Sequence, residues 1–461
     1  MEQSYDLVVI GSGPAGQKGA ICAAKMRKKV AIVERPDRLG GVSLHTGTIP
    51  SKTLREAILY LSGFRQRSFY GRDYVLQEII SLPDLSLRVR KVLEHELQVL
   101  RSQLRRNGVT VLQGSARFTG PHSLSLETAE GPQAVQAENV LIACGTRPAR
   151  NPNIPCDGKR IFDSDQLIAL DVELPRTAIV VGAGVIGLEY ASMLTALGIK
   201  TTLVDQRPTL LDFVDREIID ALTYHLRGRG TIFRLGEQVS AVEADAGRVL
   251  ARLESGKTMI ADALFYTVGR QANTDQLDVP AAGLAGDARG RVSVDGQFRT
   301  AVPHIFAAGD VIGFPALAST SMEQGRRAAL AMFGRSDLAR ELPMPYGIYT
   351  IPEISMVGRS EQELTANKVR YEVGVARYEE LAKSQILGDH LGLLKLLFDP
   401  DSLKLLGVHV LGERAAEIVH IGQAVLAFGG TIEYFRDAVF NYPTMAEAFK
   451  VAALDGLNKL G

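Results

Sequence analysis

The sequence predicts an α/β fold in which one strand–turn–helix–strand unit occurs twice. In both copies an apolar strand runs into a Gly-x-Gly-x-x-Gly turn, a helix follows, and a second strand ends in an acidic residue. The acid lies at the same distance from the last glycine in both copies. Such a unit sets a glycine turn and a helix N-terminus against a pyrophosphate. The repeat therefore predicts two Rossmann-like domains, each binding a dinucleotide.

The composition is that of an ordinary globular protein. Hydrophobic residues make up 46% and charged residues 23% of the 461 residues, a chain long enough for about two to four domains. Lys+Arg and Asp+Glu both number 52, so charge favours neither a nucleic-acid partner nor an acidic membrane. Basic residues cluster over 88–106, but apolar residues run between them at helical spacing. We interpret this cluster as a solvated helix face.

The sequence also predicts the cellular location of the protein and the state of its cysteines. No apolar run approaches the roughly 18–20 residues of a membrane span, and the N-terminus lacks the basic flank and cleavage-like site of a signal peptide. Cys22, Cys144 and Cys156 fall at no metal-ligand or redox spacing. We expect three buried or partly buried thiols, no metal site and a reducing cytoplasm.

In the first copy each glycine of the turn has a physical task. Gly11 permits the tight turn, Gly13 lets the backbone approach a pyrophosphate, and Gly16 lets the helix pack closely on the strand. The helix is predicted over 15–26. The second strand ends in Glu34, whose carboxylate can accept hydrogen bonds from a ribose diol. A glycine triplet alone is weak evidence, but the agreement of strand, helix and acid favours a dinucleotide site.

The second copy carries its turn at Gly182, Gly184 and Gly187 and its acid at Asp205. A carboxylate there suits the ribose diol of NAD and by itself repels a 2′-phosphate. Arg207 lies two residues further on and can pair with that phosphate. The two together suit a site that takes NAD and NADP in turn; the alternative is that Arg207 is simply a solvent-exposed arginine.

A third segment indicates which site holds flavin. The strand pattern over 300–308, which ends in Gly309-Asp310, resembles the second fingerprint of FAD-binding oxidoreductases. The resemblance implies that Asp310 holds the ribityl or pyrophosphate region of FAD. It also implies that Gly145 and Gly269 lie on the crossover segments between two domains. The predicted order is a first part of the FAD domain over 1–150, an NAD(P) domain over 151–270, an FAD return segment over 271–342 and an α+β dimerisation domain over 343–461.

Two segments resemble the flavin disulfide reductases, which include lipoamide dehydrogenase and glutathione reductase. Segment 40–52 resembles their redox helix, with Ser43 and Thr48 at the cysteine positions. Segment 441–447 resembles their His-Pro-Thr-x-x-Glu motif, with Tyr442 at the position of the catalytic histidine. A hydroxyl cannot form a disulfide or a flavin thiolate adduct, because both need sulfur. We expect the dithiol half of the reaction to be lost and the flavin and nicotinamide half to be retained.

The resemblance extends over 6–457 and implies a catalytic pair, Lys52 and Glu189. In that family the lysine lies beside flavin N5 and pairs with the glutamate, which keeps both groups charged where either alone would be costly. The helix start at 318–324 resembles the one that faces the flavin pyrimidine edge. The alternatives are a surface lysine for Lys52 and an ordinarily capped helix at 318–324.

Segments around Thr48 and over 210–217 and 440–448 resemble the soluble, flavin-dependent pyridine nucleotide transhydrogenases. The resemblance implies ping-pong hydride transfer from NADPH to NAD through FAD. One alternative is an NAD(P)H:quinone reductase or diaphorase, and another is a nucleotide-binding protein without turnover. The preferred direction, the relative NAD and NADP affinities and the physiological use of quinones stay open.

The C-terminal part carries a strand pattern over 393–398 and a helix pattern over 415–428. The resemblance implies a homodimer or a higher homo-oligomer whose interface lies in this part. Glu447 is left with two alternatives, orienting Tyr442 or capping a helix.

Overall fold

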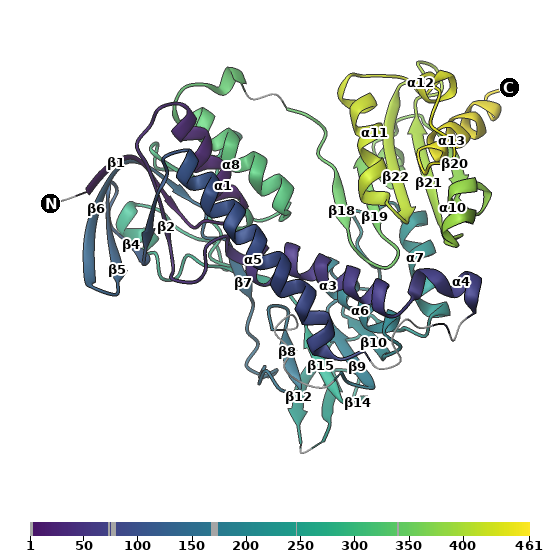
Figure 1. The fold of residues 1–461 in the computed structure, drawn as a ribbon, viewed down its shortest axis with the longest axis horizontal. Helices are drawn as coiled ribbons and strands as arrows, with labels where there is room; N and C mark the ends of the chain where they lie inside the picture. Colours follow the sequence, from purple (N-terminus) through teal and green to yellow (C-terminus); the bar gives the residue numbers. More distant parts are fainter. Residues whose placement is uncertain (1–2, 72–73, 75–79, 167–173, 246, 339–340) are drawn as a thin grey trace.

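The computed structural model describes residues 3–71, 74, 80–166, 174–245, 247–338 and 341–461. Helices cover two largely parallel sheets, and a separate antiparallel sheet lies towards the C-terminus (Figure 1). The predicted α/β class is therefore confirmed. In the described part of the chain no helix is both long enough and apolar enough to cross a membrane.

The N-terminal sheet contains the first glycine turn. Its strands lie in the order β3-β2-β1-β6-β5-β4, and β17 pairs with the end of β6. The pairs among β1, β2, β3, β6 and β17 are parallel, whereas β4 and β5 form an antiparallel hairpin beside the start of β6. A late segment of the chain thus completes an early sheet. The strands are β1 (Gln3–Ile10), β2 (Val30–Glu34), β3 (Thr110–Gln113), β4 (Ser115–Gly120), β5 (Ser123–Thr128), β6 (Gly131–Ile142) and β17 (Ile305–Ala307).

Both faces of this sheet are covered, as buried parallel strands require. Leu7 and Val9 pack against α1 (Pro14–Lys25), α8 (Ala318–Met332) and the end of α5 (Leu82–Arg106). Val8 and Ile10 alternate with them and belong to the core on the opposite face.

Helix α5 is amphipathic, as its spacing predicts. Leu85, Val89, Leu100 and Leu104 are buried. The basic residues of the helix are exposed: Arg88, Arg90, Lys91, Arg101, Arg105 and Arg106. The basic cluster is therefore a solvated helix face.

The second parallel sheet contains the second glycine turn. Its order is β11-β10-β9-β15-β8, and a three-stranded antiparallel sheet, β12-β13-β14, lies beside it. A short antiparallel pair, β7 with β16, joins the crossover segments. The elements are β7 (Thr146–Pro148), β8 (Ile161–Asp163), β9 (Thr177–Val181), α6 (Val185–Ala196), β10 (Lys200–Asp205), α7 (Arg216–Gly228), β11 (Ile232–Leu235), β12 (Val239–Ala244), β13 (Val249–Leu253), β14 (Thr258–Ala261), β15 (Ala263–Tyr266) and β16 (Arg270–Ala272).

The C-terminal sheet is antiparallel, in the order β18-β19-β22-β21-β20, and α11 and α13 pack on its core. Its elements are β18 (Tyr346–Ile348), β19 (Ile354–Gly358), α9 (Glu361–Ala366), β20 (Glu372–Arg377), α10 (Ala382–Leu387), β21 (Gly392–Phe398), β22 (Leu405–Gly412), α11 (Ala415–Ala427), α12 (Glu433–Asp437) and α13 (Glu447–Asn458). The helices α2 (Gly41–His45), α3 (Thr48–Leu61) and α4 (Arg67–Tyr70) link the first sheet to the rest of the molecule.

Helices α1 and α8 meet at a glycine, which leads to a prediction. A Cβ added at Gly325 would stand 2.0 Å from the carbonyl oxygen of Ala15, so Gly325→Ala must push the two helices apart. We expect this variant to be less stable by about 1–3 kcal/mol, measured as a lower thermal midpoint. Gly228→Ala is the matched control, because a Cβ there meets no atom within 4 Å. Equal midpoints for the two variants would contradict the packing argument.

Candidate functional site

A cavity of about 700 Å³ opens where β1, β6 and β17 end. Ligands of open α/β sheets bind at this carboxyl edge. Of the predicted cofactor-binding residues, it is lined by Gly11, Gly13, Glu34, Gly145 and Asp310. The structure thus brings residues from early, middle and late parts of the chain to one cavity.

The first glycine turn leaves room and donors for a pyrophosphate. A Cβ at Gly13 would meet nothing within 4 Å, whereas one at Gly16 would stand 1.9 Å from the carbonyl oxygen of Gly11. Gly11 itself has a φ of 103°, in the region that favours glycine. No side chain caps the N-terminus of α1, so its backbone N–H groups stay available to an anion. These residues fit a dinucleotide.

Glu34 is tied to this turn by a residue that sequence reasoning missed. Ser12 donates to the Glu34 carboxylate from its backbone N–H at 2.9 Å and from its hydroxyl at 2.7 Å. The same hydroxyl accepts from the N–H of Gly40 at 2.8 Å. Ser12 therefore joins the turn, the acid and the segment that leads into α2. Its only signal in the sequence was its place between the two glycines.

Asp310 follows β17 and faces the start of α8. The Ser321 hydroxyl donates to its carboxylate at 3.4 Å. Burial raises the pKa of Asp310, although Arg270 and Ser321 favour its charged form.

Lys52 and Glu189 come from α3 and α6 and meet at the junction of the two parallel-sheet regions. The Lys52 ammonium lies 2.7 Å from the Glu189 carboxylate, and the side chains are 27% and 7% exposed. Glu189 also accepts from the N–H of Tyr349 at 2.9 Å, and Lys52 lies 4.8 Å from the centre of the Tyr349 ring. The ion pair is present; its role beside the flavin stays a prediction.

The two positions that match cysteines in the reductases that the sequence resembles lie at the cavity. Ser43 and Thr48 both line it, and the Ser43 hydroxyl donates to the carbonyl of Gly40 at 3.1 Å. Tyr442 is not brought to the cavity of the same chain and is 71% exposed. Glu447 begins α13, and its Oε2 is buried without a hydrogen-bond partner, so it does not orient Tyr442 through this atom.

The three cysteines are free and partly buried. Burial raises the pKa of Cys22, that of Cys144 to about 12 and that of Cys156 to about 11. All three are therefore poor thiolate nucleophiles at neutral pH.

The second glycine turn repeats the geometry of the first. Gly182 has a φ of 100°, and a Cβ at Gly187 would stand 1.8 Å from the Gly182 carbonyl oxygen. A Cβ at Gly184 meets nothing within 4 Å. Asp205 accepts from the N–H of Ala183 at 2.6 Å, just as Glu34 accepts from the turn of the first copy.

Arg207 is held by Asp205 through two parallel hydrogen bonds of 2.9 and 2.7 Å. Partial burial raises the pKa of Asp205, but the bonds from Arg207 outweigh it and hold the pKa below its usual value. The Arg207 side chain is 45% exposed, so it is both fixed and accessible. At the crossover, Gly269 accepts from the N–H of Ala149 at 3.1 Å and has a φ of 79°.

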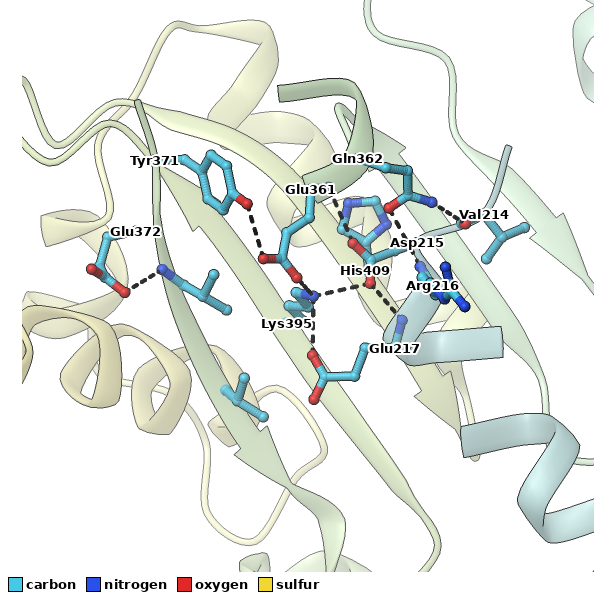
Figure 2. Close-up of polar contacts among 12 residues, drawn as sticks. Val214, Asp215, Arg216, Glu217, Glu361, Gln362, Tyr371, Glu372, Lys395 and His409 are labelled. Carbon is cyan, nitrogen blue, oxygen red and sulfur yellow. Dashed lines mark hydrogen bonds and ion pairs between the residues drawn. The ribbon is translucent and has the colours of Figure 1, made fainter. Parts of the chain in front are cut away.

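Figure 2 shows an ion cluster between α7 and the C-terminal sheet. Carboxylate oxygens of Asp215, Glu217 and Glu361 lie close enough together to hold a metal ion. The fully buried ammonium of Lys395 stands among them, 3.0 Å from Asp215 and 3.0 Å from Glu217, and bonded to Glu361. An ammonium thus takes the position that a cation would need. Sequence reasoning missed this cluster, whose one signal was a lysine within an apolar strand pattern.

Two family models match the chain. The model described as pyridine nucleotide-disulphide oxidoreductase matches residues 5–325, and the model of the dimerisation domain of these enzymes matches residues 344–453.

Curated relatives match over the full length. The soluble pyridine nucleotide transhydrogenase of Mycobacterium bovis (strain BCG / Pasteur 1173P2) is 53% identical, covering 99% of this chain and 98% of the relative. The protein of the same name from Colwellia psychrerythraea is 44% identical, covering 100% of both.

Solved structures share the fold. LpdA from Mycobacterium tuberculosis has a TM-score of 0.89 at 26% identity, covering 98% of this chain and 99% of that one. A copper(II) complex of the HOCl-induced flavoprotein disulfide reductase RclA from Escherichia coli has a TM-score of 0.88 at 26% identity, with the same coverage.

Proposed function

Because the chain belongs to the pyridine nucleotide-disulphide oxidoreductase family, we propose that it is an FAD-dependent NAD(P) transhydrogenase. It moves hydride between NADPH and NAD without a redox-active disulfide, as the names of its full-length relatives suggest. The observation that carries the proposal is the Lys52–Glu189 ion pair near a cavity that has Ser43 and Thr48 in place of a dithiol. Hydroxyls there cannot take up electrons, so the electrons must pass from the flavin to another acceptor, which the names of the relatives suggest is a second nicotinamide.

When bound, FAD supplies a ring system that takes hydride from one nicotinamide and gives it to another. Gly11 and Gly13 would hold its pyrophosphate, Glu34 its adenosine ribose and Asp310 its ribityl region. The open space at Gly13 and the free N–H groups of α1 support this assignment.

The side chains of the protein assist hydride transfer by supplying a fixed charge and by orienting the nucleotide. Lys52 holds a fixed positive charge where negative charge develops during hydride transfer. Glu189 holds that ammonium in place, and the Tyr349 N–H satisfies the remaining carboxylate oxygen. Because the same chemical bond is broken and made, the reaction is close to thermoneutral, and orientation of the nucleotide provides most of the rate.

Asp205 and Arg207 let one site take both nucleotides in turn. Once Arg207 leaves Asp205, its guanidinium would pair with the 2′-phosphate of NADP, and the freed Asp205 carboxylate would accept from the ribose diol of NAD. Gly182 and Gly184 would hold the pyrophosphate, Gly187 lets the helix pack closely on the turn, and Gly269 supplies the positive φ of the crossover.

The variant Arg207→Ala should therefore weaken the use of NADPH much more than the use of NADH. We expect the NADPH concentration for half-maximal rate to rise about 10- to 100-fold, because a charged hydrogen-bond partner of the 2′-phosphate is lost. The NADH concentration for half-maximal rate should change less than about threefold. Steady-state kinetics with each nucleotide measure both, and Arg252→Ala, an exposed arginine paired with Glu243, is the control. An equal rise for both nucleotides would contradict the assignment of Arg207 to the phosphate.

The proposed function has a direct test. The purified FAD-loaded protein is reduced anaerobically with NADPH and then mixed with NAD or a thio-NAD analogue while the flavin absorbance is followed. Rapid return of the oxidised spectrum, with matching formation of the reduced acceptor, supports the transhydrogenase. If the flavin stays reduced with NAD and returns only with a quinone, the protein is an NAD(P)H:quinone reductase.

The dimerisation-domain match over residues 344–453 supports a homo-oligomer, and we propose a homodimer as its basic unit. Large apolar side chains in this part, Tyr434, Val439 and Leu454, are 53%, 95% and 41% exposed in the single chain. A second copy that covers them would remove this apolar surface from water. The cytoplasmic location stays a prediction from the cysteine usage.

A further inference from the structure

A second cavity borders the N-terminal sheet and is called here the α5 cavity. It has a volume of about 530 Å³, within the range of about 300–1,000 Å³ that small organic ligands occupy. Its lining comes from the C-terminal half of α5, from the end of β2 with the segment that follows it, and from β3, the edge strand of the sheet. The proposed function gives this cavity no task.

Much of the lining of the α5 cavity is aliphatic. The aliphatic side chains are those of Leu39, Leu97, Leu104, Val109 and Val111. Leu104 and Val109 are buried, whereas Val111 is 38% exposed. No Phe, Tyr or Trp is among the described residues that line the cavity, so a planar base would find no such ring to stack on. An aliphatic chain that enters the cavity would remove these side chains from water.

Three guanidinium groups also border the α5 cavity. Arg35 follows β2, and Arg101 and Arg105 lie one turn apart on the solvated face of α5. Elsewhere a carboxylate holds the arginine, as Asp205 holds Arg207. Within the described ranges no ion pair holds any of the three that border this cavity. Like charges four residues apart on a helix repel each other, so an anion between them would be favourable.

The carboxylates at the α5 cavity do not balance this positive charge. Glu34 is turned towards the glycine turn, where it accepts from Ser12, and it also accepts from the backbone N–H of Arg35 at 2.8 Å. Asp37 is then the one lining carboxylate left to face three guanidinium groups. The cavity therefore combines an aliphatic surface with an excess of positive charge.

We propose that the α5 cavity binds a small anion with an aliphatic body, namely a carboxylate on a hydrocarbon chain of medium length. Arg101 and Arg105 would donate to the carboxylate, since the guanidinium fork matches its two oxygens, and the chain would lie against Leu104 and its aliphatic neighbours. Glu34 and Arg35 line the flavin cavity as well, so this ligand would lie beside the expected adenosine end of FAD. The inference goes beyond the proposed function and does not depend on it.

The test titrates the FAD-loaded full-length protein with octanoate in a calorimeter, with octanol and acetate as matched probes. Octanol has the hydrocarbon chain without the charge, and acetate has the charge without the chain. We expect octanoate to bind saturably, with about one molecule per chain, and the other two probes to bind at least about tenfold more weakly, because each lacks one half of the contacts.

Variants of the lining locate the site. Arg101→Gln and Arg105→Gln should each weaken octanoate binding about three- to tenfold, and Val111→Glu, which adds a negative charge to the wall, should weaken it more than about tenfold. Arg90→Gln is the control, an exposed arginine of the same helix that does not line the cavity. All four side chains are exposed, so FAD content and thermal midpoint should stay at the wild-type values. If Val111→Glu unfolds, the two glutamine variants decide.

Octanoate binding that does not saturate, or that is equal in Arg101→Gln, Arg105→Gln and Arg90→Gln, would overturn the inference. Adenosine 5′-monophosphate that binds more tightly than octanoate, and that Arg101→Gln no longer binds, would overturn the aliphatic class of ligand. Flotation of the protein with phosphatidylglycerol vesicles, without binding of octanoate, would mean that the basic face of α5 meets a membrane instead. No probe is a nicotinamide nucleotide, so a failure of the proposed function leaves this test unaffected.

Discussion

Replacing Lys52 with methionine slows the reduction of the bound flavin by NADPH about 100- to 1000-fold while FAD stays bound. The physical reason is that a fixed charge placed where charge develops contributes this much in active sites of this kind. Methionine keeps a similar length but offers no charge to the Glu189 carboxylate, which is 7% exposed. Anaerobic stopped-flow measurement of flavin absorbance gives the rate, and the protein-to-flavin ratio gives the FAD content.

Two further variants sharpen this experiment. Lys52→Arg keeps the charge and should recover part of the rate, although its planar group is a poorer match. Lys91→Met removes an exposed lysine of α5 and should reduce at the wild-type rate. Wild-type reduction kinetics in Lys52→Met would contradict the role assigned to this lysine.

Lys395→Met destabilises the protein by about 3–5 kcal/mol, because removing one member of a buried ion cluster leaves the others uncompensated. Burial lowers the pKa of Lys395, but hydrogen bonds and charges from Glu361, Asp215 and Glu217 outweigh it, so the ammonium stays charged. Without it, the fully buried carboxylate of Asp215 keeps only backbone donors. His409 cannot replace the cation, since burial lowers its pKa and keeps it neutral.

Thermal unfolding followed by calorimetry at one scan rate measures this effect as a lower midpoint of the first transition. The matched control is Lys459→Met, which removes an exposed lysine paired with Asp455 and should change stability by less than about 1 kcal/mol. Equal midpoints for the two variants would show that the cluster does not hold the two parts together.

Short sequence patterns made much of the fold predictable. The helix predicted over 15–26 is α1 (Pro14–Lys25), and the strand pattern over 393–398 is β21 (Gly392–Phe398). Both rest on signals within a few residues: a glycine turn before a helix, and an apolar run that only Lys395 interrupts. The pairing of Lys52 with Glu189 was predictable only from the resemblance to the flavin disulfide reductases. The residues around each of the two do not indicate which residue it pairs with.

The sequence by itself determined the class of the fold, the two glycine turns with their acids, and the loss of sulfur at Ser43 and Thr48. These features depend on residue identity and short spacing, which a linear chain displays directly. Tertiary structure alone decided that Ser12 joins Glu34 to the segment that leads into α2, and that Lys395 occupies a group of carboxylates. Each of these contacts joins segments far apart in the chain, and their meeting depends on how the sheets pack, which no local pattern encodes.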